Sequence, residues 1–279
     1  MDNIEKIQIQ QIKFALVVVE DGILPAFTGH LLRGLIYSII GDNDPELIDM
    51  LHHKSNKRPY SISKIFLEGF DKNRVIRNTG EIRLVKGDQI FFYLNLIGLN
   101  LKNRALSAII KFSNNNLRIQ TIPVQLVTIQ LNPLVWPSIE SVNGLYAIEF
   151  ETPTQLQTSE SKIYLLPDPE KLFSTLARLW LEILPEVEIL PIDKIRELAR
   201  KNTYIRNLNL VSREVDMGKI HKQVGFKGFI HLVIKGDESD KELRWLPYLL
   251  ILGSYLNLGK YRTVGMGKIV CSFPNPEQK

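Results

Sequence analysis

Hydrophobic and polar positions along the first half of the chain follow two periods, one typical of strands and one typical of helices. Several consecutive apolar positions at 7–19 predict a strand, which the Gly and Pro of "EDGILPAFTG" end. Asp44 is a plausible cap and Pro45 fits the first position of a short helix at 42–53. The same criteria predict a helix at 29–40, strands at 60–70 and 89–98, a helix at 100–112 and extended chain at 117–131.

The second half repeats this order of elements. The pattern predicts a strand starting near Gly144, then a polar linker at 155–162. It goes on to predict helices at 169–184 and 193–201, strands at 204–216 and 226–234, a helix at 241–258 and a last strand at 268–273.

Each half therefore reads strand, helix, strand, strand, helix, strand, with one extra short helix. This order is that of the split βαβ, or ferredoxin-like, unit, in which helices cover one face of an antiparallel sheet. We predict an α+β protein of two tandem ferredoxin-like (RRM-like) domains, residues 1–140 and 141–279. The duplication is inferred from the element order alone.

The composition of the chain excludes several classes of protein. A chain of 279 residues with 44% hydrophobic and 23% charged residues is neither disordered nor fibrous, and no apolar run reaches the roughly 20 residues of a membrane span. The start "MDNIEKIQIQ" lacks the pattern of a secretory signal. The single cysteine, Cys271, excludes a disulfide framework and a thiolate zinc site. We expect a cytoplasmic protein with no membrane association.

Positive charge is concentrated in three segments, although the net charge is only +5. Residues 54–86 hold nine Lys/Arg and three acids, residues 194–235 hold ten and three, and residues 258–268 hold three and none. Such segregation produces a local positive field that favours binding of a polyanion. The alternative is a set of solvated basic loops.

Known nucleotide-binding and catalytic motifs are incomplete or missing in this sequence. "LGKYRTVGMGK" at 258–268 is no Walker A loop, because Arg262 stands where Gly is needed and Ile269 where the Mg²⁺-binding hydroxyl should be. "SISK" at 61–64 lacks the companion motifs of a serine nucleophile. His-Glu-x-x-His and a close Asp/Glu cluster are both missing from the sequence, so we expect neither a metal nor a cofactor.

Two segments carry residues suited to chemistry on phosphate. On the predicted helix 29–40, His30, Arg33, Gly34 and Tyr37 lie opposite the apolar face. Ordinary packing of a tyrosine at a helix edge explains this face equally well.

The segment "LHHKSNKRPYS" follows, with His52, His53, Lys54, Lys57 and Arg58. Histidine can act as acid or base near neutral pH, and adjacent cations can stabilise a phosphoryl transition state without a metal. For His53 and Lys54, cations that complement a helix dipole are the better explanation.

At these residues the chain resembles the CRISPR-associated endoribonucleases that process precursor CRISPR RNA, the Cas6 family of the repeat-associated mysterious protein superfamily. The resemblance spans nearly the whole chain. It is carried by the following runs: "LPAFTGHLLRGLIYSII", "PELIDMLHHKSNKRPYSIS", "IEFETPTQL", "LWLEILPEVEIL", "FKGFIHLVI" and "YLLILGSYLNLGKYRTVGMGKIV". The last run, which resembles the superfamily's glycine-rich loop between the last helix and the last strand, is the most specific.

The resemblance implies metal-independent cleavage of precursor CRISPR RNA within the repeat, by attack of the RNA's own 2′-hydroxyl. The products would carry 2′,3′-cyclic phosphate and 5′-hydroxyl ends. His52 matches the family's histidine and would be the general acid or base, and Tyr37 matches a helix tyrosine of some members. His30 shares the face of Tyr37 without matching a fixed position. The family's lysine falls near Arg58, with Lys57 one place earlier, so either of these two residues would stabilise charge.

Binding of the RNA is assigned to two groups of residues. Arg33 and Lys54 belong to the first half of the chain. In the glycine-rich loop, Gly259, Gly265 and Gly267 would fold the chain tightly and bring backbone amides near the RNA, while Lys260, Arg262 and Lys268 would meet phosphates.

Two other functions stay open. The chain could be a non-catalytic RNA-binding subunit of a CRISPR effector complex, or a ferredoxin-like protein unrelated to RNA, and the histidines with Tyr37 favour the nuclease. The expected partners are CRISPR repeat RNA and precursor CRISPR RNA, with effector complex subunits as further candidates. The chain itself is expected to be a monomer or a homodimer.

Overall fold

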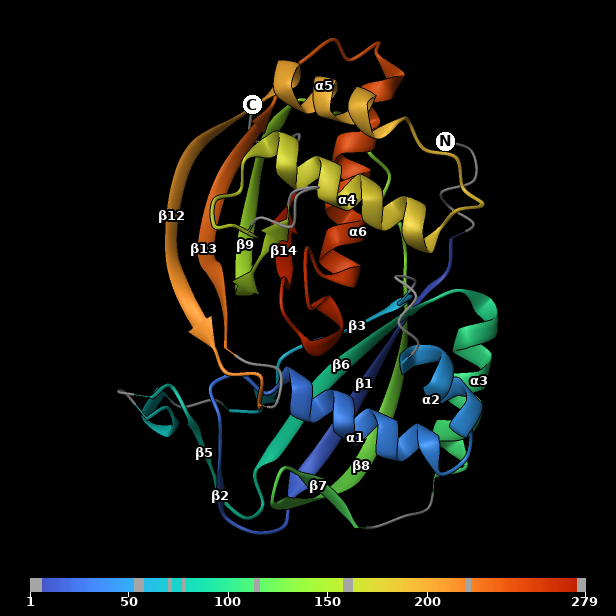
Figure 1. Ribbon diagram of the computed structural model, residues 1–279, viewed down its shortest axis with the longest axis vertical. Helices are drawn as coiled ribbons and strands as arrows, with labels where there is room; N and C mark the ends of the chain where they lie inside the picture. Colours follow the sequence, from blue (N-terminus) through green and yellow to red (C-terminus); the bar gives the residue numbers. More distant parts are fainter. Residues whose placement is uncertain are drawn as a thin grey trace.

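The computed structural model contains two antiparallel sheets, one built from each half of the chain (Figure 1). The structure describes residues 7–52, 58–69, 72–76, 79–112, 116–157, 163–218 and 222–274. Within this part of the chain, no helix is long and apolar enough to cross a membrane.

The first sheet has the strand order β3-β6-β1-β8-β7, with β4 also paired to β6. A separate two-stranded ribbon joins β2 to β5. The elements of this half are β1 (Ile9–Val18), β2 (Gly22–Leu24), α1 (Gly29–Gly41), α2 (Pro45–His52), β3 (Tyr60–Ile62), β4 (Phe66–Leu67), η2 (Lys72–Arg74), β5 (Ile82–Leu84), β6 (Gln89–Ile97), α3 (Leu99–Ile110), β7 (Leu117–Ile119) and β8 (Ile122–Leu134).

The second sheet has the order β12-β13-β9-β14, and a short ribbon joins β10 to β11. Its elements are β9 (Gly144–Thr154), β10 (Leu156–Gln157), β11 (Ile163–Tyr164), α4 (Pro169–Ile183), α5 (Ile192–Asn202), β12 (Thr203–Val215), β13 (Gln223–Ile234), η4 (Lys241–Arg244), α6 (Trp245–Leu256), η5 (Arg262–Val264) and β14 (Ile269–Ser272).

The main strands have the same spatial order in both sheets. When the four main strands of each half are numbered in chain order, the spatial order is second, third, first, fourth in both sheets, and all pairs are antiparallel. This is the arrangement of the ferredoxin-like unit, so the tandem ferredoxin-like fold predicted from the element order is confirmed.

Several predicted elements differ in detail. The single strand expected at 60–70 is two short strands, β3 and β4, which both pair with β6. The extended chain expected at 117–131 is a hairpin of β7 and β8 that turns at Gln120, whose φ is 58°. The helix expected at 241–258 begins as the 3-10 turn η4 and ends at Leu256. The expected polar linker contains β10, which pairs with β11. Ribbons of this length carry too little periodic signal to be found from sequence.

The molecule has a large hydrophobic core in each half and a small third cluster between them. In the first half, alternate residues of β1 point into the core, as strand geometry requires. The third cluster contains Phe27, which precedes α1, together with residues from the end of β12 and from the segment after α6: Val215, Met217, Val264 and Met266. The loop after α6 therefore packs against the start of α1.

Candidate active site

The polar face of α1 forms one wall of the site. Leu32, Leu35 and Ile36 are buried on the side that contacts the sheet, as are Ile39 and Ile40 one turn later. Arg33 and Tyr37 lie on the other side and stay partly exposed, with the Arg33 guanidinium carbon 6.0 Å from the Tyr37 ring centroid. A Cβ added at Gly34 would meet no atom within 4 Å, so the helix surface is open there.

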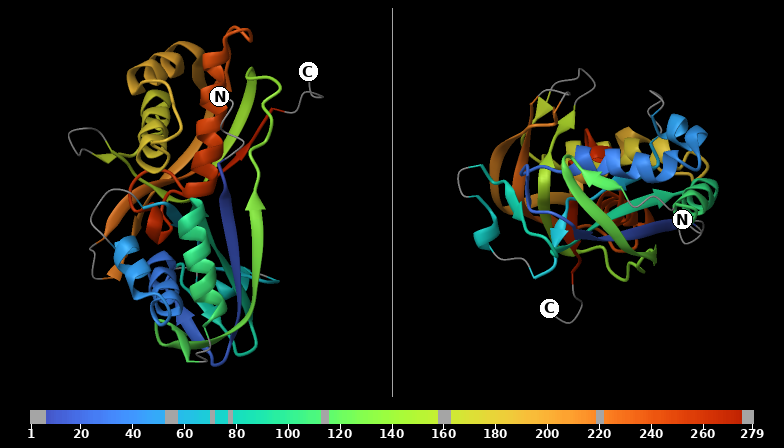
Figure 2. Two further views of the ribbon diagram at one scale, coloured as in Figure 1. Left: turned by 90° about the vertical axis from the view of Figure 1, so that its right-hand side faces the viewer. Right: turned by 90° about the horizontal axis from the view of Figure 1, so that it is seen from below.

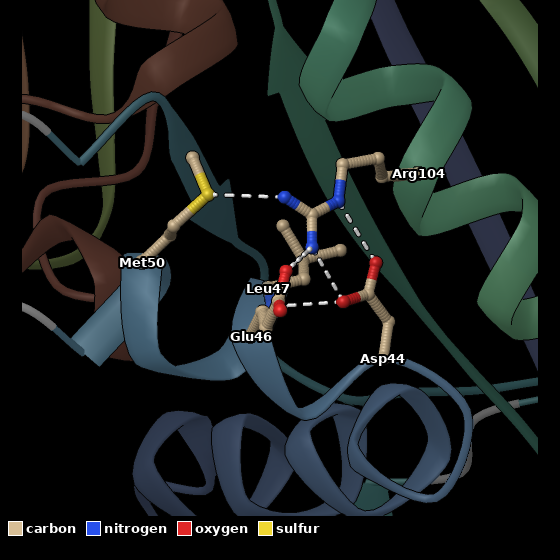
Figure 3. Close-up of polar contacts among 5 residues, drawn as sticks. All are labelled: Asp44, Glu46, Leu47, Met50 and Arg104. Atoms are coloured by element: carbon tan, nitrogen blue, oxygen red, sulfur yellow. Dashed lines mark hydrogen bonds and ion pairs between the residues drawn. The ribbon is translucent and has the colours of Figure 1, made fainter.

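A salt bridge anchors α2, the helix that carries His52. The cap predicted at Asp44 is present, because its Oδ1 accepts a hydrogen bond from the Leu47 amide at 3.0 Å. Arg104 of α3 donates to both carboxylate oxygens of Asp44, at 2.9 and 2.6 Å, and a third nitrogen lies 3.3 Å from the Met50 sulfur (Figure 3). The Arg104 guanidinium lowers the pKa of Asp44, so the carboxylate stays charged and holds α2 in place.

His52, Tyr37 and Tyr60 form a continuous cluster. The exposed His52 ring, at the end of α2, lies 4.5 Å from the Tyr37 ring, centroid to centroid, at an interplanar angle of 51°. The Tyr37 hydroxyl is hydrogen-bonded to the Tyr60 hydroxyl of β3 at 2.7 Å. Two residues singled out from sequence are therefore brought together, and a third, Tyr60, joins them.

The Tyr37 phenol is held in its neutral form. Burial raises its pKa well above the usual value, and the hydrogen bond to Tyr60 raises it further, while the positive charges of Arg33 and Arg58 act in the opposite direction with smaller effect. A neutral phenol can donate a hydrogen bond, but it is not a base near neutral pH. In this cluster the imidazole of His52 is the side chain of the kind that most often acts as a general acid or base.

Arg262 is buried and supports the strand that carries Tyr60. Its guanidinium donates to the Tyr60 carbonyl at 2.7 Å and to the Arg58 carbonyl, and the residue is only 7% exposed. Burial lowers the pKa of Arg262 to about 10, partly offset by Glu182, whose carboxylate lies 4.0 Å away. This corrects the predicted role: a guanidinium held by two backbone carbonyls is not free to bind phosphate, so Arg262 positions the site.

The amides of the glycine-rich loop, residues 258–268, also bond within the protein. Gly265 and Gly267 have φ angles of 87° and 72°, which favour glycine, and donate to the carbonyls of Arg262 and Pro153. A Cβ at Gly267 would lie 1.8 Å from the Leu258 carbonyl oxygen, and one at Gly259 would lie 2.3 Å from the Gln155 carbonyl oxygen. The amides of Gly265 and Gly267 are therefore engaged within the protein, and the RNA contact predicted for Gly259 stays a prediction.

The two lysines of the loop differ. Lys268 is partly exposed, but its Nζ donates to the Ser254 carbonyl at 2.6 Å, so its ammonium is engaged within the protein and not free for the phosphate contact predicted from the sequence. Lys260 is partly exposed, with its Nζ 4.8 Å from the Tyr261 ring centroid, and stays available to a ligand. Lys54 and Lys57 lie outside the described residues, as does His53.

His30 is not part of the His52 cluster. It precedes Tyr37 by seven residues, or about 10.5 Å along the helix axis. Its ring lies 6.3 Å from that of Phe27, and its Nδ1 is buried with no hydrogen-bond partner among the described residues. Burial lowers the pKa of His30, with a smaller opposing effect of Asp216 and a further lowering by Arg33.

The lowered pKa of His30 predicts a pH dependence of stability. Between the unfolded pKa, near 6.5, and the lower folded pKa, the unfolded chain binds more protons, so the free energy of unfolding falls as the pH decreases through this window. His30→Gln is expected to lose less stability than the native protein between pH 7.5 and pH 5. Urea unfolding at a series of pH values measures the difference, and parallel curves for the two proteins would contradict it.

Three positions that complete the site were not singled out from the sequence. Tyr60 lies just after the basic segment, so the sequence shows where it is, but not that its hydroxyl bonds to Tyr37. Arg104 is 60 residues from Asp44, and Glu182 is 80 residues from Arg262, so no local pattern links either pair. Among the described residues, no group of three His, Cys, Asp or Glu side chains is placed to hold a metal ion.

The chain is similar to known proteins. Residues 148–269 match the family model of the CRISPR-associated endoribonuclease Cas6. The chain is 24% identical to the CRISPR-associated endoribonuclease Cas6 2 of Saccharolobus solfataricus, over 96% of this chain and 98% of that protein.

Solved structures with the same fold superpose on this one. A Cas6 product complex superposes with a TM-score of 0.70 at 19% identity, covering 95% of this chain and all of that one. Cas6 of Thermus thermophilus superposes with a TM-score of 0.67 at 20% identity, over 95% and 99% of the two chains. A RAMP protein binding different RNA substrates superposes with a TM-score of 0.64 at 13% identity, over 95% of this chain and all of that one. The resemblance to the Cas6 endoribonucleases predicted from the sequence is confirmed.

Proposed function

We propose that this protein is an endoribonuclease that binds CRISPR repeat RNA and cuts precursor CRISPR RNA within the repeat, without a metal ion. The observation that carries the proposal is the His52–Tyr37 contact beside Arg33 and Arg58. It combines a proton-exchanging group, a neutral hydrogen-bond donor and two permanent cations on one face of the first domain. Similarity to Cas6 proteins along the whole chain supports the same function.

The chemistry that suits this cluster is internal transfer at phosphorus. The 2′-oxygen of the RNA bonds to the adjacent phosphorus, and the bond from phosphorus to the 5′-oxygen breaks. The attacking hydroxyl gives up its proton and the leaving oxygen gains one, which yields a 2′,3′-cyclic phosphate and a 5′-hydroxyl. His52 exchanges one of these protons, as general acid or base, which requires it to lie within hydrogen-bond reach of an RNA oxygen.

The remaining side chains bind the RNA and orient the reacting groups. Arg58 lies near enough to the Tyr37 hydroxyl to affect its pKa, so we propose that Arg58 stabilises charge on the phosphate. The other candidate, Lys57, lies outside the described residues and stays a prediction. Tyr37 holds the His52 ring through their tilted ring contact and can donate to a phosphate oxygen. Arg33, on the same helix face, would bind a neighbouring phosphate.

Cleavage of a labelled cognate repeat RNA in excess EDTA tests the proposal. We expect one cut, with a 2′,3′-cyclic phosphate identified by mass spectrometry on the upstream product. The same sequence made as DNA lacks the 2′-hydroxyl and serves as the uncut control. A strict requirement for a divalent metal would overturn the mechanism. Tight binding without any cleavage would identify a non-catalytic RNA-binding subunit instead.

A further inference from the structure

The face of the first sheet that points away from its helices carries a group of aromatic side chains. On β1 and β6 the even-numbered residues, such as Phe14 and Phe92, point into the core. Odd-numbered residues, including Lys13, Phe91 and Tyr93, therefore point to the other face. Figure 2 shows α1 and α2 on one side of the molecule and β1 and β8 on the opposite side.

Three rings on this face contact one another. Phe66 of β4 stacks on Phe91 of β6 with 5.1 Å between centroids and an interplanar angle of 11°. The Tyr93 ring meets both edge to face, at 5.8 Å from Phe66 and 5.7 Å from Phe91. All three side chains remain partly exposed to solvent. A cluster of partly exposed large rings on two neighbouring strands is unusual for a surface with no ligand.

Lysines lie over two of these rings. The Lys13 ammonium is 4.5 Å from the Phe91 centroid, and the Lys64 ammonium is 5.2 Å from the Phe66 centroid. Lys64 also forms an ion pair with Glu151 of β9 at 3.6 Å, which connects this surface to the second sheet. Lys227 of β13 lies nearby, and partial desolvation and the charge of Lys64 lower its pKa.

One end of the same face is closed. The Ser61 hydroxyl donates to the Tyr255 carbonyl of α6 at 2.9 Å, and the Asn95 side chain donates to the same carbonyl. Packing of the second domain therefore covers the end near β3 and leaves the aromatic end open.

We propose that Phe66, Phe91 and Tyr93, with Lys13 and Lys64, form an aromatic platform that binds a single-stranded segment of the RNA by base stacking. The proposal rests on the proposed function, since it concerns the same RNA. It assigns the platform to RNA outside the cut, because the platform and the His52 cluster lie on opposite faces of one sheet.

The combination of rings and lysines favours nucleic acid over a protein as the occupant. The centres of protein interfaces are depleted in lysine, whereas a groove for single-stranded nucleic acid combines aromatic stacking with cations along the backbone. A base stacked on a ring contributes more than an exposed cation–π contact, so a base can displace the lysine from the ring. The displaced ammonium is then free to pair with the adjacent phosphate.

Binding of a short single-stranded RNA of mixed sequence that contains 2-aminopurine tests the platform. Phe91→Leu and Tyr93→Leu remove one stacking surface each and keep an apolar side chain on the sheet. Each is expected to weaken binding by about 5- to 150-fold and to reduce quenching of the 2-aminopurine fluorescence. Tyr93→Phe retains the ring and should bind like the native protein, which separates loss of the ring from loss of the hydroxyl. Urea unfolding of the two Leu variants shows that their fold is kept.

Tyr164→Leu is the matched control, because Tyr164 is exposed and has the Lys171 ammonium 5.4 Å from its ring but lies on the β10–β11 ribbon. It should leave the affinity unchanged. Unchanged affinity in Phe91→Leu and Tyr93→Leu would overturn the proposal, as would a change in self-association without a change in RNA binding, which would make a protein the occupant. Affinity lost in both variants while native protein fails to cut repeat RNA would support the platform and refute the nuclease.

Discussion

Replacing His52 by alanine is expected to slow cleavage of repeat RNA by a factor of about 10²–10⁴, the usual contribution of a positioned acid or base. His52 is the exposed imidazole of the cluster and its ring contacts that of Tyr37, whose own raised pKa removes it as a base near neutral pH. Single-turnover cleavage with saturating protein measures the rate constant of the chemical step without the contribution of RNA binding.

The affinity of the His52→Ala variant for the RNA should change little, because the lost group acts on a proton rather than on a phosphate. Tyr37→Phe is the companion variant: it keeps the ring that contacts His52 and removes only the hydroxyl bonded to Tyr60. We expect it to be slowed less than His52→Ala. A near-normal rate for His52→Ala would move the catalytic role to His30 or His53.

Replacing Arg262 by alanine is expected to destabilise the protein by about 2–5 kcal/mol, because the buried carbonyl of Tyr60 and the partly buried carbonyl of Arg58 each lose a charge-assisted hydrogen bond. Glu182 would also lose its nearest cation, and its pKa, already raised by burial, would rise further. Urea unfolding measures the loss. Cleavage should decline as well, since the strand that positions Tyr60 and Arg58 loosens.

Lys260→Ala in the same loop is the matched control. Its side chain is partly exposed, so the free energy of unfolding should change little, while RNA binding should weaken and become less sensitive to salt. Equal stability of Arg262→Ala and Lys260→Ala would show that the carbonyls find other donors. In that case Arg262 would not be the link between the glycine-rich loop and the site.

Local patterns predicted much of the fold for identifiable reasons. The alternation in β1 and the two faces of α1 are consequences of strand and helix geometry, and the Asp44 cap with Pro45 marks the start of α2. The order of elements then limits the topology to the ferredoxin-like unit, because each helix must return the chain to the same sheet. His52 and Tyr37 could be singled out because they lie close together in the sequence and both side chains carry suitable chemistry.

Which cations are exposed was decided only by the tertiary structure. A sequence shows that Lys260, Arg262 and Lys268 share one glycine-rich loop. It does not show that Arg262 is covered by a segment about 200 residues away, or that the Lys268 ammonium bonds to a carbonyl of α6. The same holds for Tyr60 as the partner of Tyr37 and for the rings of β4 and β6, which meet across a strand pairing that local periodicity does not contain. The sequence by itself determined the elements, their order and the kinds of side chain available. Packing between distant segments determined which of them form a site, because burial and hydrogen bonding are properties of the assembled chain.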